Sequence, residues 1–149
     1  MTMAYKLSRT SRERLDGVHP SLIALIDYSL IGSPYDFGIP KDGGIRTLQR
    51  QQELYAKGRT TEKLREKGIN DIEGKPNEKK ITWTLNSYHR SGNAFDIYAY
   101  VNGKASWDRK YLEPIARHLQ KVALEEFDTN LEWGYDLWKK DAAHFQINE

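Results

Sequence analysis

Two well-separated stretches of the chain carry histidines and carboxylates at spacings that suit a metal site, and any fold has to bring them together. The first stretch contains His89 and, seven positions later, Asp96; the second contains Asp141 and His144. Zinc in a catalytic site usually takes three protein ligands, drawn from imidazole nitrogen and carboxylate oxygen, and keeps a fourth position open. We therefore expect His89, Asp96 and His144 to hold Zn²⁺.

The fourth residue, Asp141, stands three positions before His144. This short tether keeps its carboxylate close to the metal once His144 is a ligand. We expect Asp141 to act as a general base and not as a ligand.

Spacing alone also fits a plainer interpretation. Isolated H-x6-D and D-x2-H pairs are typical of surface polar groups, or of a half-buried network whose hydrogen bonds are satisfied. The residues around the four positions therefore have to distinguish the two interpretations.

The surrounding residues extend the pattern. Residues 87–96 match S-x-H-x-x-G-x-A-x-D, and residues 141–146 match D-x-x-H-F-Q. Residues 17–20 read Gly-Val-His-Pro and residues 44–47 read Gly-Ile-Arg-Thr. These segments resemble zinc peptidases of the D-alanyl-D-alanine carboxypeptidase group, and most closely phage endolysins of the L-alanyl-D-glutamate endopeptidase type. The resemblance runs from about Leu7 to Gln146.

The resemblance implies a role for each residue. The three zinc ligands are those named above, and Asp141 is the catalytic acid/base. Arg46 and Ser87 are implied to bind substrate. A planar arginine at a strand-to-helix junction suits a substrate carboxylate, although such an arginine is also commonly a surface residue.

The implied activity is that of a zinc metallopeptidase that cuts the peptide stem of bacterial peptidoglycan, at the L-alanyl-D-glutamate bond, as a phage lysis enzyme. Two alternatives stay open. One is a D-alanyl-D-alanine carboxypeptidase or dipeptidase of the same fold. The other is a cell-wall-binding module without catalysis, which would be expected to lack a ligand or the base.

Composition limits the partners. With 149 residues, 38% of them hydrophobic, the chain is expected to form one domain over 1–149, with a charged insertion at about 60–80. The 23 basic and 21 acidic residues leave no strong positive field for nucleic acid. The partner that the resemblance implies is the peptidoglycan stem peptide. The lack of cysteine excludes disulfides, thiolate nucleophiles and Cys-type zinc sites.

The N-terminus has no apolar run of the kind that a signal peptide requires, and no stretch reaches the length of a membrane span. We therefore expect no membrane insertion. The resemblance implies a monomer that stays in the host cytoplasm until release to the cell wall.

Hydrophobic periodicity predicts an α+β fold in which a small antiparallel sheet carries the zinc ligands and packs against helices. Helices are expected over 20–30, 48–57, 61–67 and 111–127, with a short turn over 12–15 capped by Ser11. Strands are expected over 35–39, 94–101, 104–106, 131–133 and 143–147, and loops over 40–44, 68–77 and 134–140.

Several other residues are open to two interpretations. Trp133, Tyr135 and Trp138 either line a substrate cleft or pack in the core and at its rim. His118 lies on a helix face without a spaced partner, and His19 precedes a proline, so both are expected to be structural and not ligands.

Overall fold

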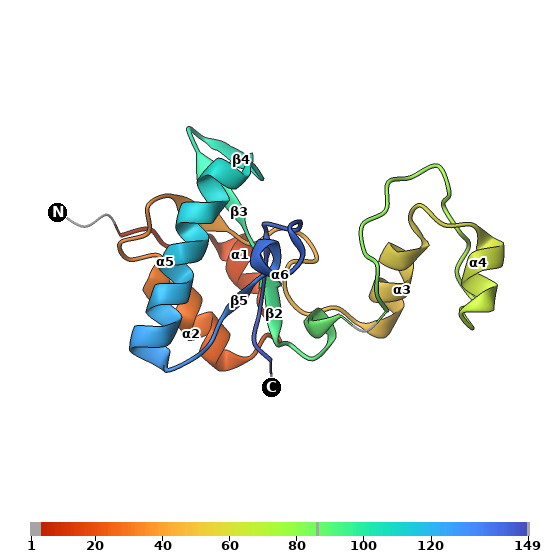
Figure 1. Ribbon diagram of the computed structural model, residues 1–149, viewed down its shortest axis with the longest axis horizontal. Helices are drawn as coiled ribbons and strands as arrows, with labels where there is room; N and C mark the ends of the chain where they lie inside the picture. Colours follow the sequence, from red (N-terminus) through yellow and green to blue (C-terminus); the bar gives the residue numbers. More distant parts are fainter. Residues whose placement is uncertain (1–3, 86, 149) are drawn as a thin grey trace.

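The computed structural model describes residues 4–85 and 87–148 and has the predicted α+β architecture (Figure 1). Its helices are α1 (Arg9–Arg14), α2 (Pro20–Ser29), α3 (Leu48–Ala56), α4 (Thr61–Glu66), α5 (Arg109–Phe127) and α6 (Gly134–Trp138), with a 3-10 turn, η1 (Tyr88–Arg90). Its strands are β1 (Asp36–Gly38), β2 (Ala94–Asp96), β3 (Tyr98–Val101), β4 (Lys104–Ser106), β5 (Glu132–Trp133) and β6 (His144–Gln146). The predicted domain limits, positions 1 and 149, lie outside the described residues.

The sheet that carries the predicted ligands has the strand order β2-β6-β5, with both pairings antiparallel. Asp96 lies directly opposite His144, and Phe95 lies opposite Phe145. Because successive side chains point to opposite faces, the two phenylalanine rings stack in the core, 5.2 Å between centroids, while Asp96 and His144 share the other face. The predicted antiparallel sheet is confirmed.

The predicted continuous strand over 94–101 is in fact two strands in two sheets. After Asp96 the chain leaves β6 and pairs with β1, so that β3 belongs to a second sheet of order β1-β3-β4. Ile97, at the junction, is fully buried, so the alternation of buried and exposed side chains continues across the break. Alternation reports which face is buried and not which strand is the partner, and the pattern therefore does not show the change of sheet.

Helices α2 and α5 pack against each other beside the sheets (Figure 1). Helix α5 begins where Asp108 caps Lys110, with an N–H···O distance of 3.0 Å. His118 of α5 bonds the carbonyl of Ser29 through Nε2 at 2.8 Å, and His19 caps α2 by accepting the N–H of Ser21. Both histidines therefore have the structural contacts that the sequence predicts for them.

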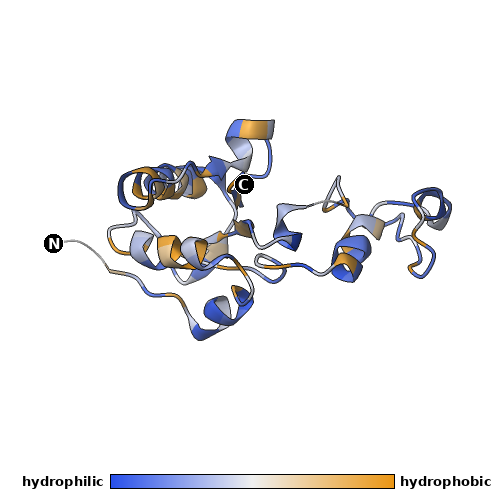
Figure 2. Ribbon diagram, turned by 90° about the horizontal axis from the view of Figure 1, so that it is seen from below, coloured by the Kyte–Doolittle hydropathy of each residue, from blue (hydrophilic) through white to orange (hydrophobic). Residues whose placement is uncertain are grey.

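Residues 48–85 project from this body as an arm that carries α3 and α4 (Figure 1). The end around α4 is largely hydrophilic (Figure 2). The predicted brief helix and the loop over 68–77 are both confirmed, but the segment is more than a solvated excursion. Leu64 and Ile69 are buried with Tyr55 and Ala56 in a small second hydrophobic cluster, so the arm has a core of its own.

Two local predictions are wrong. Ser8, and not Ser11, caps the first helix, because the Ser11 hydroxyl is buried and accepts the N–H of Ile39 at 2.9 Å. Residues 134–138, predicted as loop, form the short helix α6. A helix this short depends on its packing, which local sequence does not report.

The loop over 40–44 joins the arm to the sheet that carries the ligands. Its Gly43 carbonyl accepts the N–H of Asp96 at 2.8 Å. From the arm, the Arg50 guanidinium donates to both carboxylate oxygens of Asp42, at 2.8 and 3.0 Å. These hydrogen bonds from Arg50, together with its charge, lower the pKa of Asp42.

This pair predicts a pH-dependent contribution to stability. Asp42→Asn removes the negative charge and should destabilise the protein at pH 7 by about 1 kcal/mol, as expected for a half-exposed charged pair. Because the folded pKa of Asp42 lies below its unfolded value of about 3.9, this stability is present above pH 4 and is lost as the pH falls through the folded pKa. Urea unfolding from pH 3 to 7 measures it.

The matched control is Asp128→Asn, which also changes an aspartate at positive φ. Within the described residues, Asp128 has no ion pair. A pH-independent difference between Asp42→Asn and wild type would contradict the prediction.

Candidate metal centre

Three side-chain atoms from distant segments converge on one point. His89 Nε2, Asp96 Oδ1 and His144 Nδ1 form a triangle in which each of the three pairs is 3.2 Å apart. Both histidines are buried, and the Asp96 carboxylate is 18% exposed. The structure thus brings together the three residues that the sequence predicts as metal ligands.

The size of this triangle fits a metal ion. Tetrahedral ligands at about 2.0–2.1 Å from a zinc-sized ion lie about 3.3 Å from each other. The three observed separations of 3.2 Å are close to that value. A group of two imidazole nitrogens and one carboxylate oxygen can therefore hold a divalent cation without rearrangement.

His89 is set in place by its own turn and by the loop over 40–44. Its Nδ1 lies 2.8 Å from the Gly44 carbonyl, which can only accept, so Nδ1 carries the proton and Nε2 faces the triangle with its lone pair. Gly92 has φ +80°, and a Cβ there would meet the carbonyl oxygen of Gly17 at 2.7 Å. This turn therefore requires glycine at position 92.

Ser87 is the N-terminal cap of η1. Its hydroxyl accepts the N–H of His89 at 3.2 Å. The contact supports the position of the ligand histidine. The predicted role of Ser87 in substrate binding stays a prediction.

Arg46 lies behind Asp96 and is only 10% exposed. It donates to Asp96 Oδ2 at 3.3 Å, to the Asp42 carbonyl at 2.9 Å and to Gln51 Oε1 at 3.3 Å. Gln51, from the arm, donates in turn to the Thr84 carbonyl at 2.7 Å. The arginine predicted to face the substrate is thus also tied to a predicted metal ligand and to the base of the arm.

The charges of the three residues stabilise one another. Burial alone would raise the pKa of Asp96. When the imidazoles are protonated, the charge of His89 and the hydrogen bonds that His144 and His89 then donate outweigh burial and hold that pKa well below its usual range. For His144, burial lowers the pKa, whereas Asp96 raises it, and the net shift is upward. The carboxylate is therefore ionised at neutral pH and available to a cation.

Asp141 lies in the turn that leads into β6. Its backbone has φ +63°, and its carbonyl accepts the N–H of His144 at 3.2 Å. A Cβ at Gly134 would collide with that carbonyl, so the turn needs glycine there. The surrounding protein, by excluding water, raises the pKa of Asp141, and the nearby charge of Asp96 adds to the rise. Its carboxylate is not among the three converging groups, and its role as acid/base stays a prediction.

Of the aromatic residues that could either line a substrate cleft or pack in the core, some do one and some the other. Trp133 is fully buried, and its indole N–H donates to the Ala142 carbonyl at 2.7 Å, so it belongs to the core. Trp138 is 46% exposed, and its ring lies 5.5 Å from that of His144, at the edge of the site. Tyr135 packs on Trp133, 5.4 Å between ring centroids.

Two groups that touch the ligands had no role assigned to them from the sequence. One is the Gly44 carbonyl. Every residue has a backbone carbonyl, so the residue type does not indicate which one bonds a ligand. The other is Gln146, whose Oε1 lies 2.7 Å from His144 Nε2. The sequence offered one signal for it, since Gln146 follows His144 by two positions and so shares its face of the strand.

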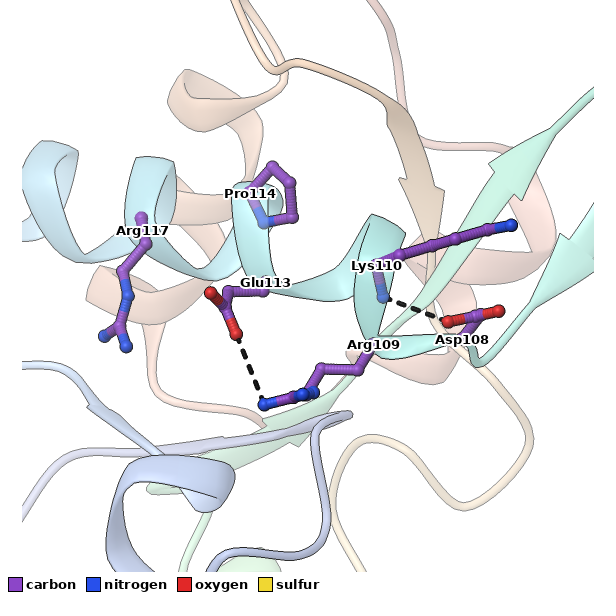
Figure 3. A pocket seen from close by; sticks show the side chains of 6 residues that line it. All are labelled: Asp108, Arg109, Lys110, Glu113, Pro114 and Arg117. Atoms are coloured by element: carbon purple, nitrogen blue, oxygen red, sulfur yellow. Dashed lines mark hydrogen bonds and ion pairs between the residues drawn. The ribbon is translucent and has the colours of Figure 1, made fainter.

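A separate surface pocket of about 460 Å³ lies along α5 (Figure 3). Its lining is of mixed charge, with Arg109 paired to Glu113 at 3.6 Å and the Asp108 carboxylate capping Lys110. None of the predicted site residues lines it. The candidate centre is therefore the triangle on the β2-β6-β5 sheet.

A buried His-Asp-His triangle on a sheet face, with another carboxylate beside it, is the arrangement of a metal-dependent hydrolase. A model of the family described as phage L-alanyl-D-glutamate peptidase matches residues 3–148. The chain is 31% identical over 145 residues to the L-alanyl-D-glutamate peptidase of Escherichia phage T5, covering 97% of this chain and 90% of that protein. The chain belongs to the phage L-alanyl-D-glutamate peptidase family.

A solved structure supports the family assignment. The crystal structure of the Serratia marcescens L-Ala D-Glu endopeptidase ChiX matches with a TM-score of 0.67 and 29% sequence identity, covering 97% of this chain and 90% of that one. Among the described residues, no helix combines the length and apolarity needed to cross a membrane.

The triangle predicts metal-dependent stability. Zinc should raise the melting temperature of the wild-type protein, because an ion that binds only the folded state at 100 times its Kd stabilises it by about 2.7 kcal/mol. His144→Ala removes one of the three ligand atoms and should abolish the zinc-dependent rise in melting temperature. His19→Asn, which keeps a capping side chain on α2, is the matched histidine control and should behave as wild type. An equal rise in His144→Ala would contradict the assignment.

Proposed function

We propose that this protein is a zinc peptidase that hydrolyses the L-alanyl-D-glutamate bond in the peptide stem of bacterial peptidoglycan and acts as a phage endolysin. The observation that carries the proposal is the 3.2 Å triangle of His89, Asp96 and His144 in a chain that belongs to this peptidase family over 3–148. A binding module would not need to keep three converging ligand atoms.

Zinc is the ion that suits the donor set. Two imidazoles and one carboxylate are ligands that zinc accepts in catalytic sites, and the hard cations Ca²⁺ and Mg²⁺ prefer oxygen ligands. A zinc ion held by these residues supplies polarisation of the scissile carbonyl and activation of water.

Asp141 is the acid/base of the proposal. The residue keeps an exposed surface although neighbouring protein surrounds much of its carboxylate, and within the described residues its side chain makes no hydrogen bond or ion pair. It is therefore free to accept a proton from the attacking water and to deliver it to the amine that leaves when the C–N bond breaks.

Arg46 and Ser87 are the proposed substrate-binding residues. Arg46 uses three of its five N–H groups on Asp96, Asp42 and Gln51, which leaves two for a substrate carboxylate. The Ser87 hydroxyl accepts from His89 and keeps its own proton to donate. Peptidoglycan stems carry both carboxylates and peptide carbonyls that such donors can bind.

On this proposal the protein works as a monomer on the stem peptide, with neither nucleic acid nor a membrane as its partner. It acts after release from the host cytoplasm to the cell wall.

Digestion of purified peptidoglycan tests the function. We expect new N-terminal D-glutamate and L-alanine C-termini in the soluble fragments, detected by mass spectrometry, and no release after treatment with a chelator. Fragments shortened by D-alanine alone would assign the carboxypeptidase activity instead. Metal-loaded protein that releases no fragment would overturn the proposal.

The proposed role of Asp141 predicts loss of turnover with retention of the metal. Asp141→Asn should lower kcat by at least about 100-fold, the lower range for general acid/base catalysis. Zinc content should be unchanged, because the carboxylate is not a ligand. Asp128→Asn, at the same sign of φ, is the control and should leave kcat as in wild type. Full activity in Asp141→Asn would remove the residue from the mechanism.

A further inference from the structure

A line of hydrogen bonds crosses the face of the β2-β6-β5 sheet behind the metal triangle. His144 Nε2 lies 2.7 Å from Gln146 Oε1, and Gln146 Nε2 donates to Glu132 Oε1 at 3.1 Å. Glu132 stands opposite Gln146 across the β5-β6 ladder, as Asp96 stands opposite His144 across the β2-β6 ladder. The sheet register therefore places all four side chains on one face.

The charge of Glu132 determines which way the Gln146 amide points. An ionised carboxylate can only accept, so the NH₂ end of the amide has to face Glu132. The amide oxygen then faces His144. The opposite orientation would put the amide oxygen against the carboxylate, two acceptors with no proton between them.

The orientation of the amide in turn determines the tautomer of His144. An amide oxygen can only accept, so Nε2 has to carry the proton. In the neutral ring Nδ1 is then left with its lone pair, and Nδ1 is the atom that lies 3.2 Å from both His89 Nε2 and Asp96 Oδ1. Gln146 and His144 are only 8% and 6% exposed, so water competes little with these bonds.

We propose that Gln146 and Glu132 are a positioning pair that fixes His144 in the Nε2–H tautomer and so presents Nδ1 to the metal. The inference rests on the metal site of the proposed function but not on the bond that is cleaved. His89 needs no such pair, because the Gly44 carbonyl performs the same task with a backbone atom.

Loss of the pair should weaken metal binding by about 10- to 100-fold, the usual effect of removing an outer partner of a ligand histidine. Gln146→Leu removes the acceptor at Nε2 and keeps a buried side chain of similar size. Competition with a chromophoric chelator measures the zinc affinity of the purified protein. Gln120→Leu is the matched control, since Gln120 bonds the Leu131 carbonyl away from the ligands, and should bind zinc as wild type.

The double variant Glu132→Gln/Gln146→Glu separates positioning from simple packing. It exchanges the two groups and keeps both bonds: the new carboxylate accepts from His144 Nε2, and the new amide donates to that carboxylate. We expect zinc affinity within a few-fold of wild type. The variant also keeps the test valid if Gln146→Leu fails to fold.

The Nε2 proton of His144 is observable by ¹H–¹⁵N NMR of the zinc-loaded protein, in which an ion at Nδ1 leaves Nε2 as the site of the ring proton. This proton should exchange slowly with water in wild type and in the double variant, and faster in Gln146→Leu. Wild-type zinc affinity in folded Gln146→Leu, or no recovery in the double variant, would overturn the inference. Wild-type protein that binds zinc but cleaves no wall would overturn the proposed function alone.

Discussion

The metal triangle requires three lone pairs to face one another at 3.2 Å, and each is held there by a contact on its far side. The Gly44 carbonyl holds His89, Arg46 holds Asp96, and Gln146 holds His144. Converging acceptors repel when no cation or proton lies between them, so the rest of the structure has to supply these outer contacts. A fold that placed the ligands without them would not keep the site open for an ion.

Backbone geometry supplies part of this support. The β2-β6 register sets Asp96 opposite His144. In the loop over 40–44, the Gly43 carbonyl accepts the N–H of Asp96, and the Gly44 carbonyl bonds Nδ1 of His89. The arm holds that loop through Arg50, which forms two hydrogen bonds with Asp42. The arm is thus connected to the loop beside the centre, although its α4 end projects away from the sheets in Figure 1.

Much of the fold followed from pattern alone. The helices expected over 20–30 and 111–127 and the strand expected over 104–106 rest on local signals, and the structure has them as α2, α5 and β4. The break at Ile97 and the helix at 134–138 did not follow, because both depend on what the chain packs against. Glu132 gave no signal either, since its partner is fourteen positions away and is set by strand pairing.

The sequence by itself determined which residues can bind a metal: residue types and spacing named His89, Asp96 and His144, and the motif around them named the family. Only the tertiary structure decided which atom of each residue faces the ion and what holds it. The reason is physical. Side-chain chemistry is a property of the residue, whereas the free lone pair of an imidazole depends on its hydrogen-bond partner, and in this protein those partners come from a distant loop and from the same sheet face.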